Sequence, residues 1–145
     1  MNPADLTFDH LGIVVGDLEA AHSRCQGLLG PLARSRRFDD PELGVSVAFV
    51  RDTHGLVYEL IAPLGTASPV SRALRAQVNI LNHVAYRTTS LEATTRRLRK
   101  ERAIAIGNPK RALAFGGARI QFLQTDLGFL IELIEADRIV HEFRD

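Results

Sequence analysis

The sequence predicts an α+β fold of two tandem βαβββ modules, which form an open, cup-shaped mixed β-sheet with helices outside. Three observations predict it. The 145-residue chain is 46% hydrophobic, which is typical of one compact domain. The chain aligns with itself without gaps when it is shifted from His10 to His83. Each copy then shows the same order of apolar runs, helix start and glycine turns.

The repeat aligns corresponding elements rather than scattered residues. The stretch DLEAA at 17–21 falls on SLEAT at 90–94, and YELI at 58–61 falls on IELI at 131–134. Residues at expected turns and strands coincide as well, namely Gly44 with Gly117, Phe49 with Phe122, and Gly55 with Gly128. Two copies of one supersecondary unit are the simplest explanation.

The first copy begins with the β-branched run 8–15, which predicts a strand. Asp17 then starts a helical pattern, and Gly30-Pro31 ends it. Three strands are expected to follow, around 33–38, at 44–50 and at 55–63.

The second copy predicts a strand at 80–88, a helix at 91–102, and strands near 104–106, 117–124 and 128–135. Between the copies, a linker at 66–78 follows Pro63 and Gly65, contains Pro69 and includes a short helix at 69–76. We therefore expect a single domain over 1–145, with module one at 5–65 and module two at 79–137.

Composition narrows the class of partner. The net charge is +1, and no nucleic-acid-binding module or membrane-length apolar run is present in the sequence. The one cysteine, Cys25, cannot form an internal disulfide, and it lies in a helical pattern that is typical of a structural residue. No signal peptide precedes the first apolar run. We therefore expect a cytoplasmic protein with a small-molecule substrate, without nucleic acid or membrane partners.

Arginines cluster at 34–37, at 72 and 75, and at 96–102. Such clusters are either solvated surfaces or sites that attract a phosphate-bearing substrate. The second interpretation is possible because the guanidinium group matches phosphate geometry. The sequence leaves both interpretations open.

Two histidines and two glutamates recur in the repeat. His10 precedes Glu59, and His83 precedes Glu132, by the same number of residues. A single strand histidine is usually structural. A glutamate within an apolar strand, however, is costly to bury unless it has a partner or binds metal. If a pseudo-two-fold axis relates the copies, all four side chains converge, and the sequence predicts a four-ligand metal site.

Two imidazoles and two carboxylates suit one divalent first-row ion, such as Co, Ni, Mn, Zn or Fe. A closed structural zinc site usually contains thiolates, which are missing from this set. We therefore expect the ion to act as a Lewis acid on a bound oxygen.

The stretches HLGIVV, DLEAA and NHVAY, together with the two ELI strands, resemble the vicinal oxygen chelate superfamily, which includes glyoxalases, extradiol dioxygenases and bleomycin-resistance proteins. Within it, PELGVSVAFV at 41–50 and YELIAPLGTASPVSRAL at 58–74 look most like the methylmalonyl-CoA epimerases. The resemblance implies that His10, Glu59, His83 and Glu132 are the metal ligands. It further implies that Glu42 is a catalytic base and that Glu132 can also carry a proton.

The implied activity is epimerisation of an acyl-CoA or other thioester through an enolate that the metal stabilises. Glu42 has no counterpart in the second copy, where Phe115 aligns with it, as expected if one substrate breaks the symmetry. We expect a homodimer, and the modules pair either within one chain or across the dimer.

Three other functions remain open on the same scaffold. A lactoylglutathione-lyase-like enzyme would use the same four ligands. An extradiol dioxygenase would normally use only two histidines and one carboxylate. A metal-free resistance protein that binds a small molecule would have little need of all four ligands.

Overall fold

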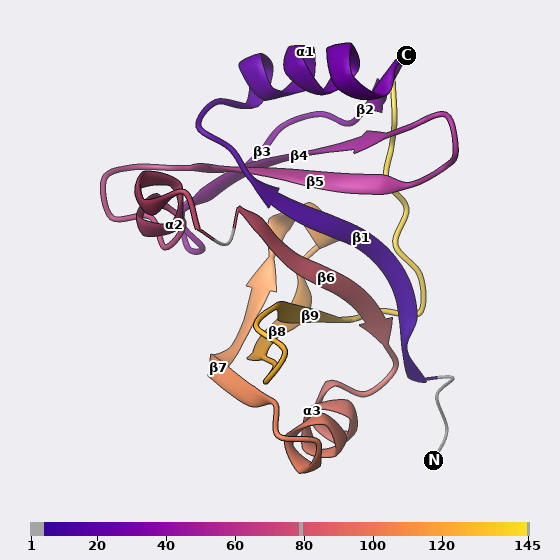
Figure 1. Cartoon of the computed structure of the whole chain (residues 1–145). Coiled ribbons are helices and arrows are strands. Elements are labelled where there is room, and N and C mark those ends of the chain that lie inside the picture. Colours follow the sequence, from indigo (N-terminus) through magenta and orange to yellow (C-terminus); the bar gives the residue numbers. More distant parts are fainter. Residues whose placement is uncertain (1–4, 79, 145) are drawn as a thin grey trace. The chain divides into compact units, whose positions relative to one another are not determined.

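The computed structural model describes residues 5–78 and 80–144, and these separate into two compact units. The first unit contains residues 10–82 and 140–144, and the second contains 5–9 and 83–139. Within the described residues there are nine strands and three α-helices (Figure 1). Their order confirms the α+β class and the repeated module. The expected start of module two, Asn79, lies outside the described residues, and the domain limits stay predictions.

The first module is a mixed sheet with one covering helix. Its elements are β1 (Thr7–Val14), α1 (Leu18–Leu29), β2 (Ala33–Arg34), β3 (Phe38–Asp40), β4 (Val45–Arg51) and β5 (Val57–Pro63). The strands are ordered β2–β4–β5–β1, with β1 parallel to β5 and the other neighbours antiparallel. The sheet therefore places the first and last strands of the module side by side.

The single strand expected around 33–38 is instead two short strands, β2 and β3, which both pair with β4. Ser35 lies at the break, where its hydroxyl accepts a hydrogen bond from the Phe49 amide at 2.9 Å. A side chain thus takes the place of a backbone acceptor there, which interrupts the ladder.

Helix α1 has the expected start and end. The Asp17 side chain accepts a hydrogen bond from the Ala20 amide at 2.8 Å, and Gly30 follows the helix with φ of 87°. Leu18 joins a core cluster with Leu32, Val50, Leu60 and Ala62. Figure 1 shows α1, drawn in indigo, running alongside strands β4 and β5.

The predicted linker contains the short helix α2 (Ser71–Ala76), which starts two residues later than expected and is followed by Gln77 with φ of 55°. Within the parts of the chain that the structure describes, no helix has both the length and the apolar character needed to cross a bilayer.

The second module repeats the plan with β6 (Leu81–Thr88), α3 (Leu91–Lys100), β7 (Ile104–Ala112), β8 (Ala118–Gln124) and β9 (Leu130–Glu135). The strand order is β6–β9–β8–β7, with β6 parallel to β9. Its core cluster contains Leu91, Leu98, Ala103, Leu123 and Leu133. A 3₁₀ turn at Leu113–Phe115 leads from β7 to β8.

Strand β7 is longer than the 104–106 segment that its apolar residues predict. Pairing with β8 breaks between Ile106 and Lys110 and then resumes at Lys110–Ile120. The added residues at 107–112 are mostly exposed and include Gly107, Pro109 and two cations, so they carry no apolar alternation that would predict a strand. Backbone pairing across a bulge extends the strand instead.

Glycine at position 44 is expected to be required for the turn that carries Glu42. Gly44 has φ of 72°, and a Cβ there would lie 3.1 Å from Pro69 Cδ. Gly55 has φ of 86° but open space around it, which makes it a matched control. Gly55→Ala should cost about 1–2 kcal/mol of unfolding free energy from backbone strain alone, and Gly44→Ala should cost more. Urea unfolding of both variants measures the difference, and equal losses would contradict the role of the Pro69 contact.

Candidate functional site

His10 and Glu59 of the first unit face each other across neighbouring strands. The register of β1 and β5 places Gly12 beside Glu59, and His10 is two residues before Gly12 on the same face. Because Gly12 has no side chain, the carboxylate can extend toward the imidazole. Glu59 Oε1 lies 3.5 Å from His10 Nε2, and the two residues are only 5% and 0% exposed.

The second unit repeats this arrangement with His83 and Glu132. The register of β6 and β9 places Ala85 beside Glu132, and His83 is again two residues earlier on the strand. Glu132 Oε1 lies 3.3 Å from His83 Nε2, and each residue is 2% exposed. A small residue thus lies opposite the glutamate in both copies, which is a shared feature that the sequence comparison missed.

Each histidine also packs against a phenylalanine from the next strand. Phe49 pairs with Glu59, and its ring centroid is 5.5 Å from that of His10 at 77°. Phe122 pairs with Glu132, and its ring centroid is 5.3 Å from that of His83 at 76°. The apolar rings fix the orientation of the imidazoles and limit the access of water to the carboxylates.

The spacing within each pair fits two ligands of one metal ion. The N–O separations of 3.5 and 3.3 Å exceed the usual hydrogen-bond range. Imidazole nitrogen and carboxylate oxygen bind first-row ions at about 2.0–2.2 Å, so two ligands at roughly 90–110° are about 3.0–3.5 Å apart. Each unit therefore holds a buried His–Glu pair whose geometry and donor chemistry fit half of the predicted site.

The C-terminal segment adds a histidine that the repeat could not reveal. The His141 ring lies 4.2 Å from the Phe49 ring and 6.3 Å from the His10 ring. Backbone hydrogen bonds between Arg34 and Arg144, of 3.0 and 2.6 Å, hold this segment on β2. His141 follows the second copy, so no internal alignment assigns it a partner, and burial by a distant segment is not visible in sequence.

Glu42 is exposed in the turn at 41–44, between β3 and β4. The Asp40 carboxylate shapes this turn by accepting a hydrogen bond from the Leu43 amide at 3.1 Å. The structure brings together His10 with Glu59, and His83 with Glu132. It does not bring Glu42 into hydrogen-bond or ion-pair contact with another described residue.

Cys25 of α1 is half-buried, and burial raises the pKa of its thiol. A raised pKa lowers the fraction of reactive thiolate at neutral pH, which agrees with its interpretation as a structural residue.

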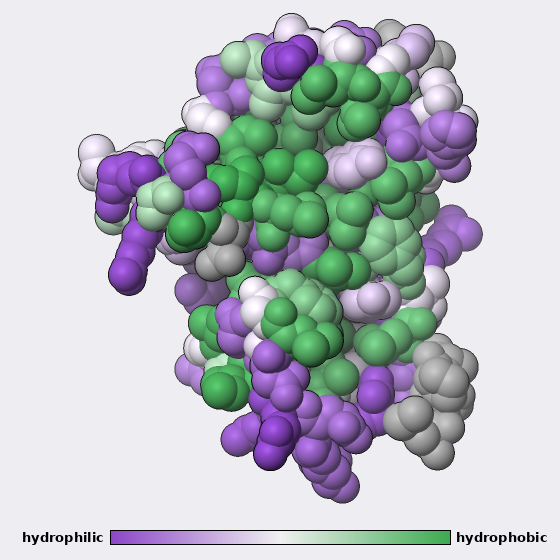
Figure 2. Space-filling model, viewed as in Figure 1, coloured by the Kyte–Doolittle hydropathy of each residue, from purple (hydrophilic) through white to green (hydrophobic). Residues whose placement is uncertain are grey.

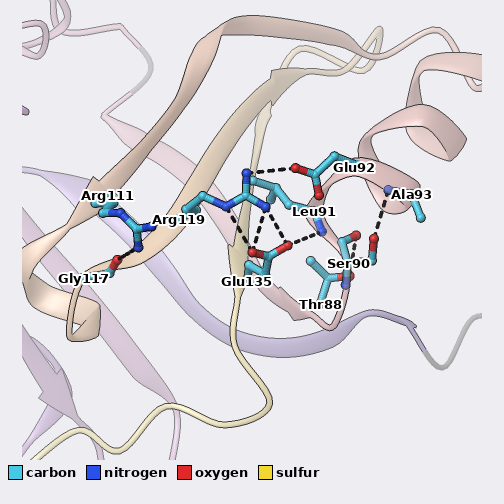
Figure 3. A network of polar contacts seen from close by, with 9 residues as sticks. All are labelled: Thr88, Ser90, Leu91, Glu92, Ala93, Arg111, Gly117, Arg119 and Glu135. Atoms are coloured by element: carbon cyan, nitrogen blue, oxygen red, sulfur yellow. Dashed lines mark hydrogen bonds and ion pairs between the residues drawn. The ribbon is translucent and has the colours of Figure 1, made fainter.

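A charged network ties α3 to the end of β9, three residues beyond Glu132 (Figure 3). Arg119 binds Glu92 of α3 and Glu135 of β9, each at 2.8 Å. Glu135 also accepts a hydrogen bond from the Leu91 amide at 2.9 Å. That amide bond and the Arg119 guanidinium lower the pKa of the Glu135 carboxyl. The network thereby anchors the helix start to the strand that carries Glu132.

Comparison with known families identifies the family described as the Glyoxalase/Bleomycin resistance protein/Dioxygenase superfamily, which matches residues 9–122. No curated protein matches the chain.

Solved structures are similar over almost the whole chain. Methylmalonyl-CoA epimerase from Mycobacterium tuberculosis has 26% identity and a TM-score of 0.78, over 95% of this chain and 93% of its own. A Streptomyces coelicolor methylmalonyl-CoA epimerase in complex with 2-nitronate-propionyl-CoA has 25% identity and a TM-score of 0.75, over 92% and 99%. A hypothetical protein from Bacillus halodurans C-125, at 24% identity with a TM-score of 0.78 over 94% and 99%, shows the fold alone.

The Glu135 network is expected to lose its stabilising effect in acid. Because the pKa of Glu135 is lower in the folded chain than its ordinary value of 4.5, the network stabilises the fold above that pH. This contribution is lost as the pH falls through the lowered pKa. Glu135→Gln should therefore be less stable than the wild type at pH 7, and the difference should shrink in acid. Urea midpoints across this range measure it.

Glu101→Gln is the matched control, because it removes the same charge from an exposed residue that makes no ion pair within the described residues. An equal loss of stability in Glu101→Gln at pH 7 would show that the network itself contributes nothing.

Proposed function

The chain belongs to the glyoxalase/bleomycin resistance protein/dioxygenase superfamily, and from this premise we propose that it is a metal-dependent epimerase acting on a CoA thioester. The matched residues include His10, Glu59 and His83. The observation that carries the proposal is the buried His–Glu pair, which occurs in both units with the same neighbours.

The proposal assigns all four side chains to one divalent ion, which is Co, Ni, Mn, Zn or Fe. The same strand register, similar N–O separations and similar burial in both pairs support this assignment. Such a convergence brings two carboxylates into one buried place, and a divalent cation would offset their charge. The two pairs meet either within one chain or between two copies.

Proton transfer is assigned to Glu42 and Glu132. When bound, the ion supplies a Lewis acid that makes the proton alpha to the thioester more acidic. Epimerisation needs a base on one face of that carbon and an acid on the other. Glu42 removes the proton, and its exposure in the turn leaves the carboxylate accessible to a substrate. Glu132 returns a proton from the opposite side.

Two observations support a CoA thioester in particular. One of the similar structures is an epimerase in complex with 2-nitronate-propionyl-CoA. The second is the sequence PLGTASPV after β5, which resembles the same epimerases. The location in the cytoplasm and the homodimer stay predictions.

The deciding experiment measures two reactions with the metal-loaded protein. We expect methylmalonyl-CoA to epimerise and its alpha proton to exchange with solvent deuterium, which NMR detects. Turnover of a glutathione hemithioacetal alone would refute the epimerase and favour a lactoylglutathione-lyase-like enzyme. If no divalent ion binds after incubation, the metal-free binding protein becomes the better explanation.

Removal of a proposed ligand should abolish ion binding while the fold survives. We expect the ion content of His83→Ala and of Glu132→Ala to fall from one bound ion per site to nearly none, because a lost donor cannot be replaced inside the sheet. Elemental analysis measures the ion, and circular dichroism measures the fold. His54→Ala, at an exposed turn, is the control. Wild-type ion content in both ligand variants would refute the site.

Glu42→Gln should keep the ion and lose the reaction. The amide preserves the size of the side chain but cannot accept the substrate proton, so turnover should fall by roughly 10²–10⁴-fold. Steady-state kinetics and ion content are measured on the same preparation. Glu142→Gln, an exposed substitution in the C-terminal segment, is the control. Undiminished turnover in Glu42→Gln would remove Glu42 from the mechanism.

A further inference from the structure

The second unit carries a groove of about 590 Å³ between α3 and the bulged part of β7. Three cationic side chains of α3 line it, together with the bulge and a buried glutamine. These residues are Arg96, Arg99, Lys100, Asn108, Pro109 and Gln121. The His83–Glu132 pair is not among the lining residues, and the proposed metal chemistry makes no use of this groove.

The wall of the groove is held in place by Gln121. This residue is 4% exposed, and its side-chain amide donates to the carbonyl oxygens of Ile106 and Gly107 at 3.1 and 3.2 Å. Those carbonyls lie where the pairing of β7 with β8 shifts, and Gly107 has φ of 65°. A buried polar side chain therefore fixes the bulge that forms one side of the groove.

The opposite side of the groove is strongly cationic. Arg96, Arg99 and Lys100 lie three and four residues apart, which places them on one helical face. In the described part of the chain, no carboxylate forms an ion pair with any of the three. Figure 2 shows hydrophilic side chains gathered where Figure 1 draws α3.

Glu92 is the one acidic residue in the lining, and its carboxylate already forms an ion pair with Arg119. Arg119 binds the Glu92 carboxylate at 2.8 Å and holds Glu135 as well (Figure 3). The groove therefore keeps an excess of positive charge even with Glu92 beside it.

The scaffold does not require these cations. In the first copy, Ser23, Gln26 and Gly27 align with Arg96, Arg99 and Lys100. Cations near a helix C-terminus can stabilise the helix through its dipole, yet α1 has no basic residue in its last turn. Arg96 also lies in the middle of α3 rather than at its end. A ligand explains all three positions together.

We propose that this groove binds an organic diphosphate, such as the diphosphate of a nucleotide. Three cations match the charge of about −3 on a nucleoside diphosphate. Each guanidinium group can also donate two parallel hydrogen bonds to phosphate oxygens. Ala105 adds apolar lining for the organic part. The volume is within the usual range of small-molecule sites. The diphosphate belongs either to a free nucleotide or to the nucleotide end of a CoA.

ADP, AMP and adenosine are the probes, titrated calorimetrically into the full chain at low salt. We expect ADP to bind most tightly, AMP more weakly and adenosine not measurably, because the phosphates supply the attraction. Arg96→Gln combined with Arg99→Gln should weaken ADP binding by about tenfold or more, since each lost phosphate contact is a charge-assisted bond.

Arg24→Gln combined with Arg138→Gln removes the same charge from exposed positions outside the groove, and should change ADP affinity by no more than about twofold. An equal loss in this control, equal binding of adenosine, or no ADP binding at millimolar concentration would overturn the proposal. A lower melting temperature of the Arg96/Arg99 variant with unchanged ADP affinity would also overturn it, because the cations would then serve only the helix.

Two further measurements test whether the groove acts independently of the metal site and identify the source of the diphosphate. His83→Ala should bind ADP as the wild type does, and loss of binding there would overturn a site that is independent of the metal. If saturating CoA displaces ADP, the groove takes the nucleotide end of CoA. If ADP still binds beside CoA, the groove takes a free nucleotide. Both of these last outcomes support the site.

Discussion

The candidate site depends on one constraint, which is the burial of a glutamate inside a β-sheet. A carboxylate removed from water costs several kcal/mol or more unless a partner compensates it. In each unit the partner is a histidine two positions along the neighbouring parallel strand, as His10 is for Glu59. A glycine or an alanine opposite the glutamate makes the approach possible. The same solution occurs twice, so the scaffold contains two equivalent buried His–Glu pairs.

Parallel pairing of the first and last strands is what creates this geometry, and it requires a connection that leaves the sheet and returns. Helices α1 and α3 form part of that connection in the two modules. Both begin with a side chain that caps the helix, from Asp17 to the Ala20 amide and from Ser90 to the Ala93 amide. The two caps, Asp17 and Ser90, align with each other in the repeat, so both helices begin at equivalent positions of their modules.

Much of this could be predicted from the sequence, because the relevant signals are local and occur twice. The strand runs, the helix caps and the spacing of His10 and Glu59 are all visible in one copy and repeated in the other. The extension of β7 was missed because backbone pairing, rather than apolar alternation, maintains it. His141 was missed for a different reason, since its place beside Phe49 depends on a tail that follows the second copy.

The two His–Glu pairs are alike in strand register, N–O separation and burial. The copies differ elsewhere. Glu42 aligns with Phe115, Arg96 aligns with Ser23, and His141 follows the repeated part of the chain. These residues occur on an exposed turn, on a helix surface and in a terminal segment, outside the strands that carry the two His–Glu pairs. The duplicated strands therefore carry what the two copies share, which is the buried His–Glu pair, and the unmatched positions carry what distinguishes one copy from the other.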